Sequence, residues 1–483
     1  MRPARSLWLA ALGIAAFVAL CFLLQTLTTV RSSDLALHYS LVDYFTRCWS
    51  LPPQVVNPMM AGYSPISHMV AGGIGRVVGS GFLGMHFASL GFVFLIYVFL
   101  FLGLERQSLL STLVSYALLF FAIAALHYSF ALHGYEIIYT YFFAQVAGDA
   151  AFLALLWVLS GRDRSANELV LLPLLVFAMG WLYPLAQAKL AIGILALWLF
   201  ELVRVWLATK TVDWRIVRSI LILGALFAAA ILLHPEFSHF RWIAKNNGAT
   251  RQTLSLAAIG GLAALLFLAS LALAALALAR KIGLTRPVFI ATVGVATVSA
   301  YLAQAVLYFG FAEASEYAVR KHAYAITTLL AVAAIALLVE GAERLIPRLR
   351  GARLPAFLAG GSAAIAAAFL VTLILISHYA EDRTEFLAYQ REVRGEPLLK
   401  GQTLSLNRAH PGEFNLAITV VDLDLPGGLY PFIPLVLGRS QPSGTPTVFP
   451  RFALVSRTSS VSPGCKLAEP VLAHAAVTAY GCK

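Results

Sequence analysis

LSLAAIGGLAALLFLASLALAALALA, residues 254–279, decides the fold class, because this long segment contains no charged side chain. As an α-helix, at about 1.5 Å per residue, it is long enough to cross the roughly 30 Å of a bilayer's hydrocarbon core. Its apolar residues are continuous rather than alternating, which is typical of a membrane helix and not of a barrel strand. The segment therefore predicts a transmembrane helix.

Similar apolar segments recur along the chain. Of its 483 residues, 60% are hydrophobic and 12% are charged, whereas an ordinary soluble domain has roughly 25% charged residues. We therefore predict an all-α polytopic membrane protein with about eleven transmembrane helices. The predicted spans are residues 7–29, 82–104, 109–127, 137–160, 168–184, 185–203, 219–234, 254–279, 288–310, 323–340 and 355–378. Residues 168–203 break near Pro184, so the alternative is a hairpin that dips without crossing.

The basic residues predict the orientation of the chain. The net charge of +12 is distributed between spans rather than gathered in one patch, which argues against a nucleic-acid partner. Lys and Arg concentrate in alternating loops, so the N-terminus should be cytoplasmic and the C-terminal tail external. The residues assigned to the cytoplasmic side are Arg2, Arg5, Arg106, Arg162, Arg164, Arg204, Lys210, Arg215, Arg218, Arg280, Lys281, Arg286, Arg344, Arg348, Arg350 and Arg353. We expect an integral protein of a bacterial inner membrane.

The predicted spans divide the chain into two parts. Residues 1–378 form a transmembrane module whose first external loop is 30–81, and residues 379–483 form a small external appendage. The appendage contains a strand-like run, NLAITVVDLDL, at 415–425. Cys465 and Cys482 could form a disulfide in an oxidising compartment, although four cysteines allow three full pairings.

The first external loop begins with a predicted amphipathic helix that ends before Pro52. Its spacing places Asp34, His38, Leu41 and Phe45 on one face. Burying a carboxylate costs on the order of several kcal/mol unless partners or chemistry stabilise it. Asp34 is therefore a candidate catalytic residue. The alternative is that its charge only favours the helix N-terminus.

A second external helix is predicted after Ser64 and Pro65. Its glycines, Gly72 and Gly75 among them, permit close helix contact. His68 and Arg76 could face a phosphate group, or they could simply satisfy neighbouring polar groups.

These loop motifs resemble those of a known family. DLALHYSLVDYF at 34–45, LPP at 51–53 and YSPISHMVAGGIG at 63–75 follow one span and a short cytoplasmic N-terminus. This arrangement is similar to the GT-C superfamily of membrane glycosyltransferases, in particular the aminoarabinose transferase and protein mannosyltransferase group. The resemblance covers roughly residues 1–155 and implies a catalytic carboxylate at Asp34. Leu35 stands where some branches have a second acid, which leaves metal dependence open.

Other external loops supply further candidates. Glu136 lies where enzymes of this group often have a second acidic residue, and His133 and Tyr135 beside it could hold a sugar by hydrogen bonding and ring stacking. The alternative is an interfacial loop with aromatic anchors. Arg320 and Lys321 could stabilise a departing phosphate, or they could be basic side chains that reach for the membrane interface at a helix end. Glu316 and Arg320 are spaced to pair on a helix.

Two further sets of polar residues have other candidate roles. The motif HPEFSH contains His234, Glu236 and His239, which could form a divalent-metal cluster. Pro235 prevents a regular helical presentation of these residues, so they are weak metal candidates; we require no cofactor and leave a divalent metal open. Asp149 lies inside a predicted span, where a carboxylate is either functional or paired within the bundle.

These residues and the resemblance lead us to expect a glycosyltransferase. A polyprenyl-phosphate sugar would be the donor, and a hydroxyl of a glycan, glycolipid or protein would be the acceptor. Asp34 would act as general base in a single inverting displacement at the external face. One alternative is a transporter or flippase, which needs charged groups deep in the bundle such as Asp149 and Lys189. Another is a polysaccharide polymerase or ligase of a different fold.

Overall fold

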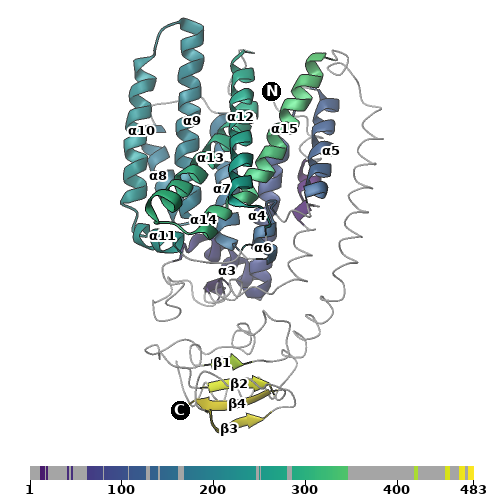
Figure 1. The fold of residues 1–483 in the computed structure, drawn as a ribbon, viewed down its shortest axis with the longest axis vertical. Helices are drawn as coiled ribbons and strands as arrows, with labels where there is room; N and C mark the ends of the chain where they lie inside the picture. Colours follow the sequence, from purple (N-terminus) through teal and green to yellow (C-terminus); the bar gives the residue numbers. More distant parts are fainter. Residues whose placement is uncertain are drawn as a thin grey trace. The chain divides into compact units, whose positions relative to one another are not determined.

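A computed structural model gives the structure of the chain (Figure 1). The structure describes residues 11–16, 18–19, 38, 41–42, 45–46, 63–79, 81–106, 108–126, 131–139, 142–161, 168–245, 250, 252–279, 286–345, 418–421, 452–456, 467–473 and 477–482. The chain divides into two compact units, one of residues 1–23, 64–67 and 86–375 and the other of residues 24–63, 68–85 and 376–483.

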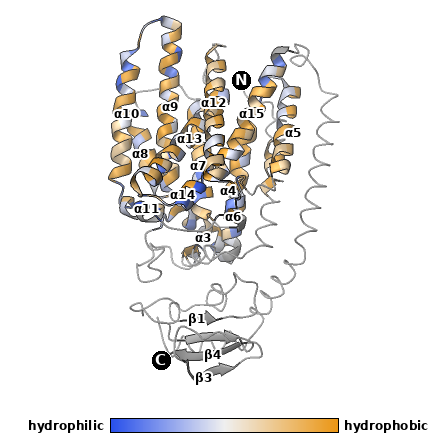
Figure 2. Cartoon of the chain, in the orientation of Figure 1, coloured by the Kyte–Doolittle hydropathy of each residue, from blue (hydrophilic) through white to orange (hydrophobic). Residues whose placement is uncertain are grey.

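The membrane part of the structure is helical, as predicted. Eight helical segments are long and apolar enough to cross a membrane, and they correspond to eight of the predicted spans. Their helices are α4 (Gly81–Gly103), α5 (Leu109–Leu126), α7 (Phe143–Ser160), α9 (Pro184–Thr209), α10 (Trp214–Leu232), α12 (Leu256–Ala279), α13 (Arg286–Phe311) and α15 (Ala323–Leu345). The chain thus has the helices of an integral membrane protein, and hydrophobic residues run along their length (Figure 2).

The other predicted spans have different outcomes. The span at 168–184 corresponds to α8 (Glu168–Gly180), which has 13 residues and contains Pro173. At about 1.5 Å per residue α8 is roughly 20 Å long, shorter than the hydrocarbon core. Its partner α9 is long and apolar enough to cross a membrane, and whether the 168–203 hairpin crosses stays a prediction. The span at 355–378 and most of the span at 7–29 lie outside the described residues, and the count of eleven stays a prediction.

Short helices occupy one end of the helical unit. These are α6 (Tyr135–Tyr139), α11 (Phe237–Ala244) and α14 (Glu316–Arg320), and Figure 1 shows them together at the lower end of the bundle. The loop between α9 and α10 lies at the opposite end. The segments predicted to share the external side thus share one end. The assignment of that end to a compartment stays a prediction.

Close contact between α7 and α9 positions the centre of the bundle. A Cβ added at Gly148 would lie 2.7 Å from the Cβ of Tyr183 and 2.8 Å from the Cβ of Ala186. Such distances are below van der Waals contact, so only glycine fits there. By contrast, only 11% of the spanning window of α10 is buried inside the protein. The α7–α9 pair is therefore core, whereas α10 presents most of its surface outward.

The second unit contains the start of the first loop. His38, Leu41 and Phe45 are buried, as their shared helical face predicts. The helix α3 (Ile66–Val78) begins just after Pro65, and its Gly72 lies against the Phe45 backbone and side chain. The predicted packing role of Gly72 is therefore confirmed.

The second unit also contains a four-stranded sheet in the order β1-β2-β4-β3. The strands are β1 (Ile418–Val421), β2 (Phe452–Ser456), β3 (Leu467–Ala473) and β4 (Val477–Cys482). The β1 and β2 strands are parallel, and the other neighbouring pairs are antiparallel. The β1 strand falls within the strand-like run at 415–425. Cys465 lies outside the described residues.

Candidate functional site

A buried turn before α6 holds the first part of the site. The Nδ1 of His133 lies 2.9 Å from one carboxylate oxygen of Glu136, and the other oxygen accepts a 2.6 Å hydrogen bond from the Gly134 N–H. Both side chains are buried. Gly134 has φ of 110°, a backbone conformation that glycine adopts without strain. The turn therefore presents an imidazole and a carboxylate as one hydrogen-bonded pair.

Two other helices fix the position of this turn. The Tyr97 hydroxyl on α4 donates a 2.7 Å hydrogen bond to the His133 carbonyl. The His133 N–H donates to the Thr328 hydroxyl on α15 at 2.9 Å. Because these groups are buried, water does not compete for their hydrogen bonds. The two bonds therefore hold the backbone of the turn in place. Tyr135, predicted to stack on a sugar, is itself buried.

A buried ion pair lies between α7 and α9. The Nζ of Lys189 is 2.6 Å from Oδ1 of Asp149, and these side chains are 2% and 3% exposed. The second oxygen, Oδ2, is buried and has no hydrogen-bond partner among the described residues. Removing two charges from water is costly unless they pair well. The sequence left open whether Asp149 is functional or is paired within the bundle. In the structure Asp149 is paired with Lys189.

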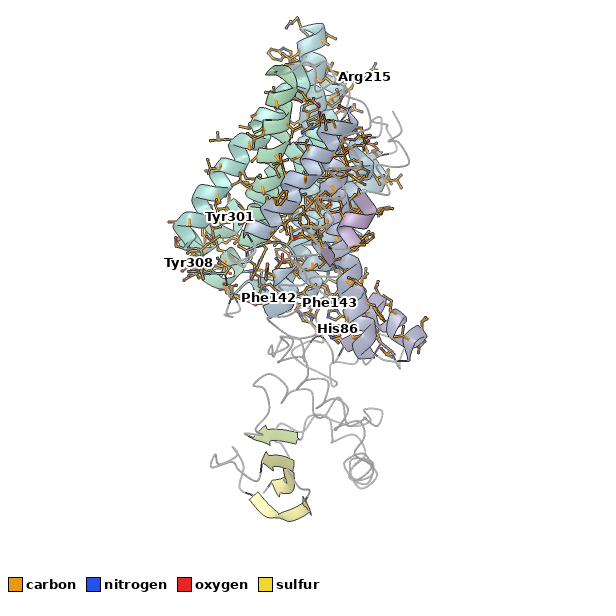
Figure 3. The ribbon with its side chains drawn as sticks, turned by 90° about the vertical axis from the view of Figure 1, so that its right-hand side faces the viewer. His86, Phe142, Phe143, Arg215, Tyr301 and Tyr308 are labelled. Atoms are coloured by element: carbon orange, nitrogen blue, oxygen red, sulfur yellow. The ribbon has the colours of Figure 1, made fainter. Side chains whose placement is uncertain are left out.

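Lys321 lies between α14 and α15, at the end of the bundle that also carries α6 (Figure 1). Its Nζ is 4.1 Å from the ring centre of Phe142 and 4.2 Å from that of Tyr317. Such cation–π contacts contribute about 0.5–2 kcal/mol each. The Lys321 carbonyl accepts a 3.4 Å hydrogen bond from the side-chain amide of Gln145, near the start of α7. Figure 3 labels Phe142 at the end of the bundle opposite Arg215.

Phe142 joins the acidic turn to the basic loop. Its N–H donates a 2.8 Å hydrogen bond to the Glu136 carbonyl, while its ring faces Lys321. The two loops that the sequence singled out for sugar and phosphate therefore meet at one residue.

Arg320 behaves differently from its neighbour Lys321. Its guanidinium donates to Glu316 at 2.6 Å and to the Leu254 carbonyl at 2.7 Å. The predicted pairing of Glu316 with Arg320 is thereby confirmed. These bonds hold the Arg320 guanidinium to α14 and to the segment before α12.

Sequence reasoning missed two polar residues at this end, Gln145 and His322. The Nε2 of His322 lies 2.6 Å from the side-chain oxygen of Gln304 on α13, and His322 is 1% exposed. Gln145 bonds Lys321 and lies 3.4 Å from the Tyr183 hydroxyl. The available signal was a polar side chain about two turns inside an apolar span for Gln145, and one directly before an apolar span for His322.

The second unit brings two other candidates together. The Nδ1 of His38 lies 2.8 Å from Nε2 of His68, and the Tyr63 ring packs edge-on against both imidazoles. Arg76 donates a hydrogen bond to the Thr46 carbonyl at 2.9 Å. Asp34 lies outside the described residues.

In the HPEFSH motif at 234–239, the candidate metal ligand His234 is surrounded by aromatic rings. His234 packs against the rings of Phe177, Trp181 and Phe240, and its Nδ1 accepts from the Glu236 N–H at 3.2 Å. Burial lowers the pKa of His234 and raises that of Glu236. The His239 side chain is outside the described part.

Among the residues that the structure describes, one group of three can offer metal ligands. It consists of His133, Glu136 and Asp149, whose ligand atoms lie within 4.8 Å of one another.

No protein-family model matches the chain, and no curated protein matches it. Function must therefore be argued from the site.

Proposed function

We propose that the protein is a membrane glycosyltransferase that uses a polyprenyl-phosphate-linked sugar. The acceptor would be a hydroxyl of a glycan, glycolipid or protein, and transfer would occur at the end of the bundle that carries α6 and α14. We assign that end to the outer face of a bacterial inner membrane, with the N-terminus in the cytoplasm.

The bridge through Phe142 is the observation that supports this proposal most. A transferase of this kind needs an acid near the sugar and a cation near the phosphate that leaves. The Glu136 carbonyl bonds the Phe142 N–H, and the Phe142 ring lies against the Lys321 ammonium group. One short stretch of chain thus couples an acidic turn to a cation.

The proposed roles follow the chemistry of each group. Asp34 would take the proton from the acceptor hydroxyl, whose oxygen attacks the anomeric carbon while the bond to the phosphate oxygen breaks. Lys321 would stabilise the charge on the departing phosphate. Glu136, oriented by His133, would position the sugar or the acceptor. The Lys321 ammonium group lies against two aromatic rings at the end of the bundle that carries the Glu136 turn, whereas the Arg320 guanidinium forms an ion pair with Glu316; we therefore assign the phosphate role to Lys321 rather than to both residues.

A transporter or flippase is the second candidate, and the Asp149–Lys189 pair favours it. A buried pair inside a helical bundle is the kind of group that transporters use for ions or polar solutes. The pair is 2.6 Å long and nearly inaccessible to solvent.

Transfer assays separate the two candidates. Membranes containing the wild type or a variant are supplied with radiolabelled lipid-linked sugars, and sugar incorporated into acceptor is measured. We expect Asp34→Asn to abolish incorporation and Lys321→Ala to reduce it by at least about tenfold. Lys245→Ala is the matched control, because Lys245 is an exposed lysine held by Glu313 at 2.8 Å. Normal incorporation by Asp34→Asn would refute the assigned base. Translocation of a lipid-linked sugar without incorporation would favour the transporter.

A further inference from the structure

We propose that His133, Glu136 and Asp149 form a binding site for a first-row divalent transition metal, best represented by Zn²⁺. One ligand atom from each residue lies within 4.8 Å of the others, and all three side chains are buried. The site is distinct from the HPEFSH motif that the sequence offered for a metal. It concerns binding alone, so it holds whether the protein transfers sugars or moves a solute.

The donor set suits such an ion. One imidazole and two carboxylates are common ligands of Zn²⁺, with bonds of about 2.0–2.2 Å, which places tetrahedral ligand atoms about 3.4 Å apart. His133 Nδ1 and Glu136 Oε1 are 2.9 Å apart, so they already lie within that spacing. The widest separation in the group is no more than 4.8 Å. Side-chain rotation that moves Asp149 by on the order of 1 Å would complete the site.

Asp149 has an unused oxygen that a cation would satisfy. Its Oδ2 is buried without a hydrogen-bond partner among the described residues, and a buried unsatisfied acceptor is costly. Lys189 holds the other oxygen at 2.6 Å. Lys189 is therefore a cation beside the proposed site, on the carboxylate oxygen that the metal would not use.

The carboxylate groups of Glu136 and Asp149 both belong to the proposed site, and carboxylates are common ligands of a divalent cation. The hydrogen bonds that Tyr97 and Thr328 make to the His133 backbone fix the imidazole-bearing turn. Three protein ligands leave a coordination position for water or an anionic group.

Metal binding to the purified full-length protein tests the site. The protein, with any purification tag removed, is stripped with EDTA, and Zn²⁺ binding is followed by calorimetry at one neutral pH. We expect wild type to bind one tight equivalent. Because loss of an outer-shell partner alone weakens sites about 10–100-fold, loss of a ligand in His133→Ala or Asp149→Asn should weaken binding by more than about 100-fold. Glu236→Gln is the control at the competing motif and should bind as wild type does.

Lys189 variants separate a metal site from a purely structural ion pair. Lys189→Met removes a cation next to the site, so Zn²⁺ should bind at least as tightly as to wild type and should raise the unfolding temperature more. Asp149→Asn/Lys189→Met removes both charges, which keeps the fold testable while the ligand is absent, and it should lose the tight equivalent. The proposal is overturned if wild type binds no tight equivalent, if the double variant keeps it, or if Glu236→Gln removes it.

Discussion

The ring of Phe142 lies 4.1 Å from the ammonium nitrogen of Lys321, while the Phe142 N–H bonds the Glu136 carbonyl at 2.8 Å. Phe142, which lies just before α7, therefore contacts both the turn that carries Glu136 and the cation between α14 and α15. Through Phe142, the turn that carries Glu136 therefore helps to fix the position of the Lys321 ammonium group, where a ligand would contact it.

Lys321 and Arg320 should have separable effects. Arg320 is held by Glu316 and the Leu254 carbonyl, so Arg320→Ala should lower the unfolding temperature while donor use changes by less than about twofold. Lys321→Ala should instead lower kcat/KM for the lipid-linked donor by at least about tenfold, because the departing phosphate loses the cation that stabilises its charge. Steady-state transfer kinetics with varied donor measure both. An equal loss in the two variants would contradict the separate roles.

The Asp149–Lys189 pair should show strong coupling. Each single substitution, Asp149→Asn or Lys189→Met, strands a buried partner and should destabilise the protein by about 3–5 kcal/mol. The double variant should cost less than the sum of the two, because no buried charge stays unpaired. Thermal unfolding in a single detergent, analysed as a double-mutant cycle, gives the coupling. Additive losses would show that the charges do not stabilise one another.

Gly148 should not tolerate a side chain. In Gly148→Ala the new Cβ would lie 2.7 Å from Tyr183 Cβ and 2.8 Å from Ala186 Cβ, so α7 and α9 must separate, at a cost of about 1–3 kcal/mol. The matched control is Gly224→Ala on α10, where nothing lies within 4 Å of the new atom. That change should be neutral or stabilising by up to about 1 kcal/mol. Unfolding temperatures of both variants provide the comparison.

His234 should make the protein less stable in mild acid. Burial among aromatic rings lowers its folded-state pKa below 6.5, so the unfolded chain binds the proton more readily. The stability contribution is complete above about pH 6.5, declines as the pH falls below that value, and is lost below the lowered pKa. His234→Phe should flatten this limb of the stability curve between neutral pH and the lowered pKa. Unfolding temperature against pH measures it, and an unchanged slope would argue that the pKa of His234 is the same in the folded and unfolded states.

Local patterns predicted much of this structure. Apolar runs marked the eight long helices, because a lipid-facing helix must be apolar over its whole length. The i,i+4 spacing of Glu316 and Arg320 predicted their ion pair, since both side chains rise from one helical face.

The contacts between helices could not be predicted from the sequence. Lys189 and Asp149 were each recognisable as charges inside spans, but their pairing depends on the rotation of α9 against α7. That rotation is set by the fit of Gly148 to Tyr183 and Ala186. Gln145 and His322 were missed for the same reason. Pro173 lies inside α8, and hydropathy alone did not show that this helix would be shorter than its neighbours.

The mutual neutralisation of Asp149 and Lys189 has an electrical consequence. A single charge carried across the full membrane voltage changes energy by about 2.3 kcal/mol per 100 mV. The paired carboxylate and ammonium groups carry no net charge, so the voltage exerts no net force on them while they stay 2.6 Å apart. A movement of α7 with α9 that kept the pair intact would therefore be electrically silent.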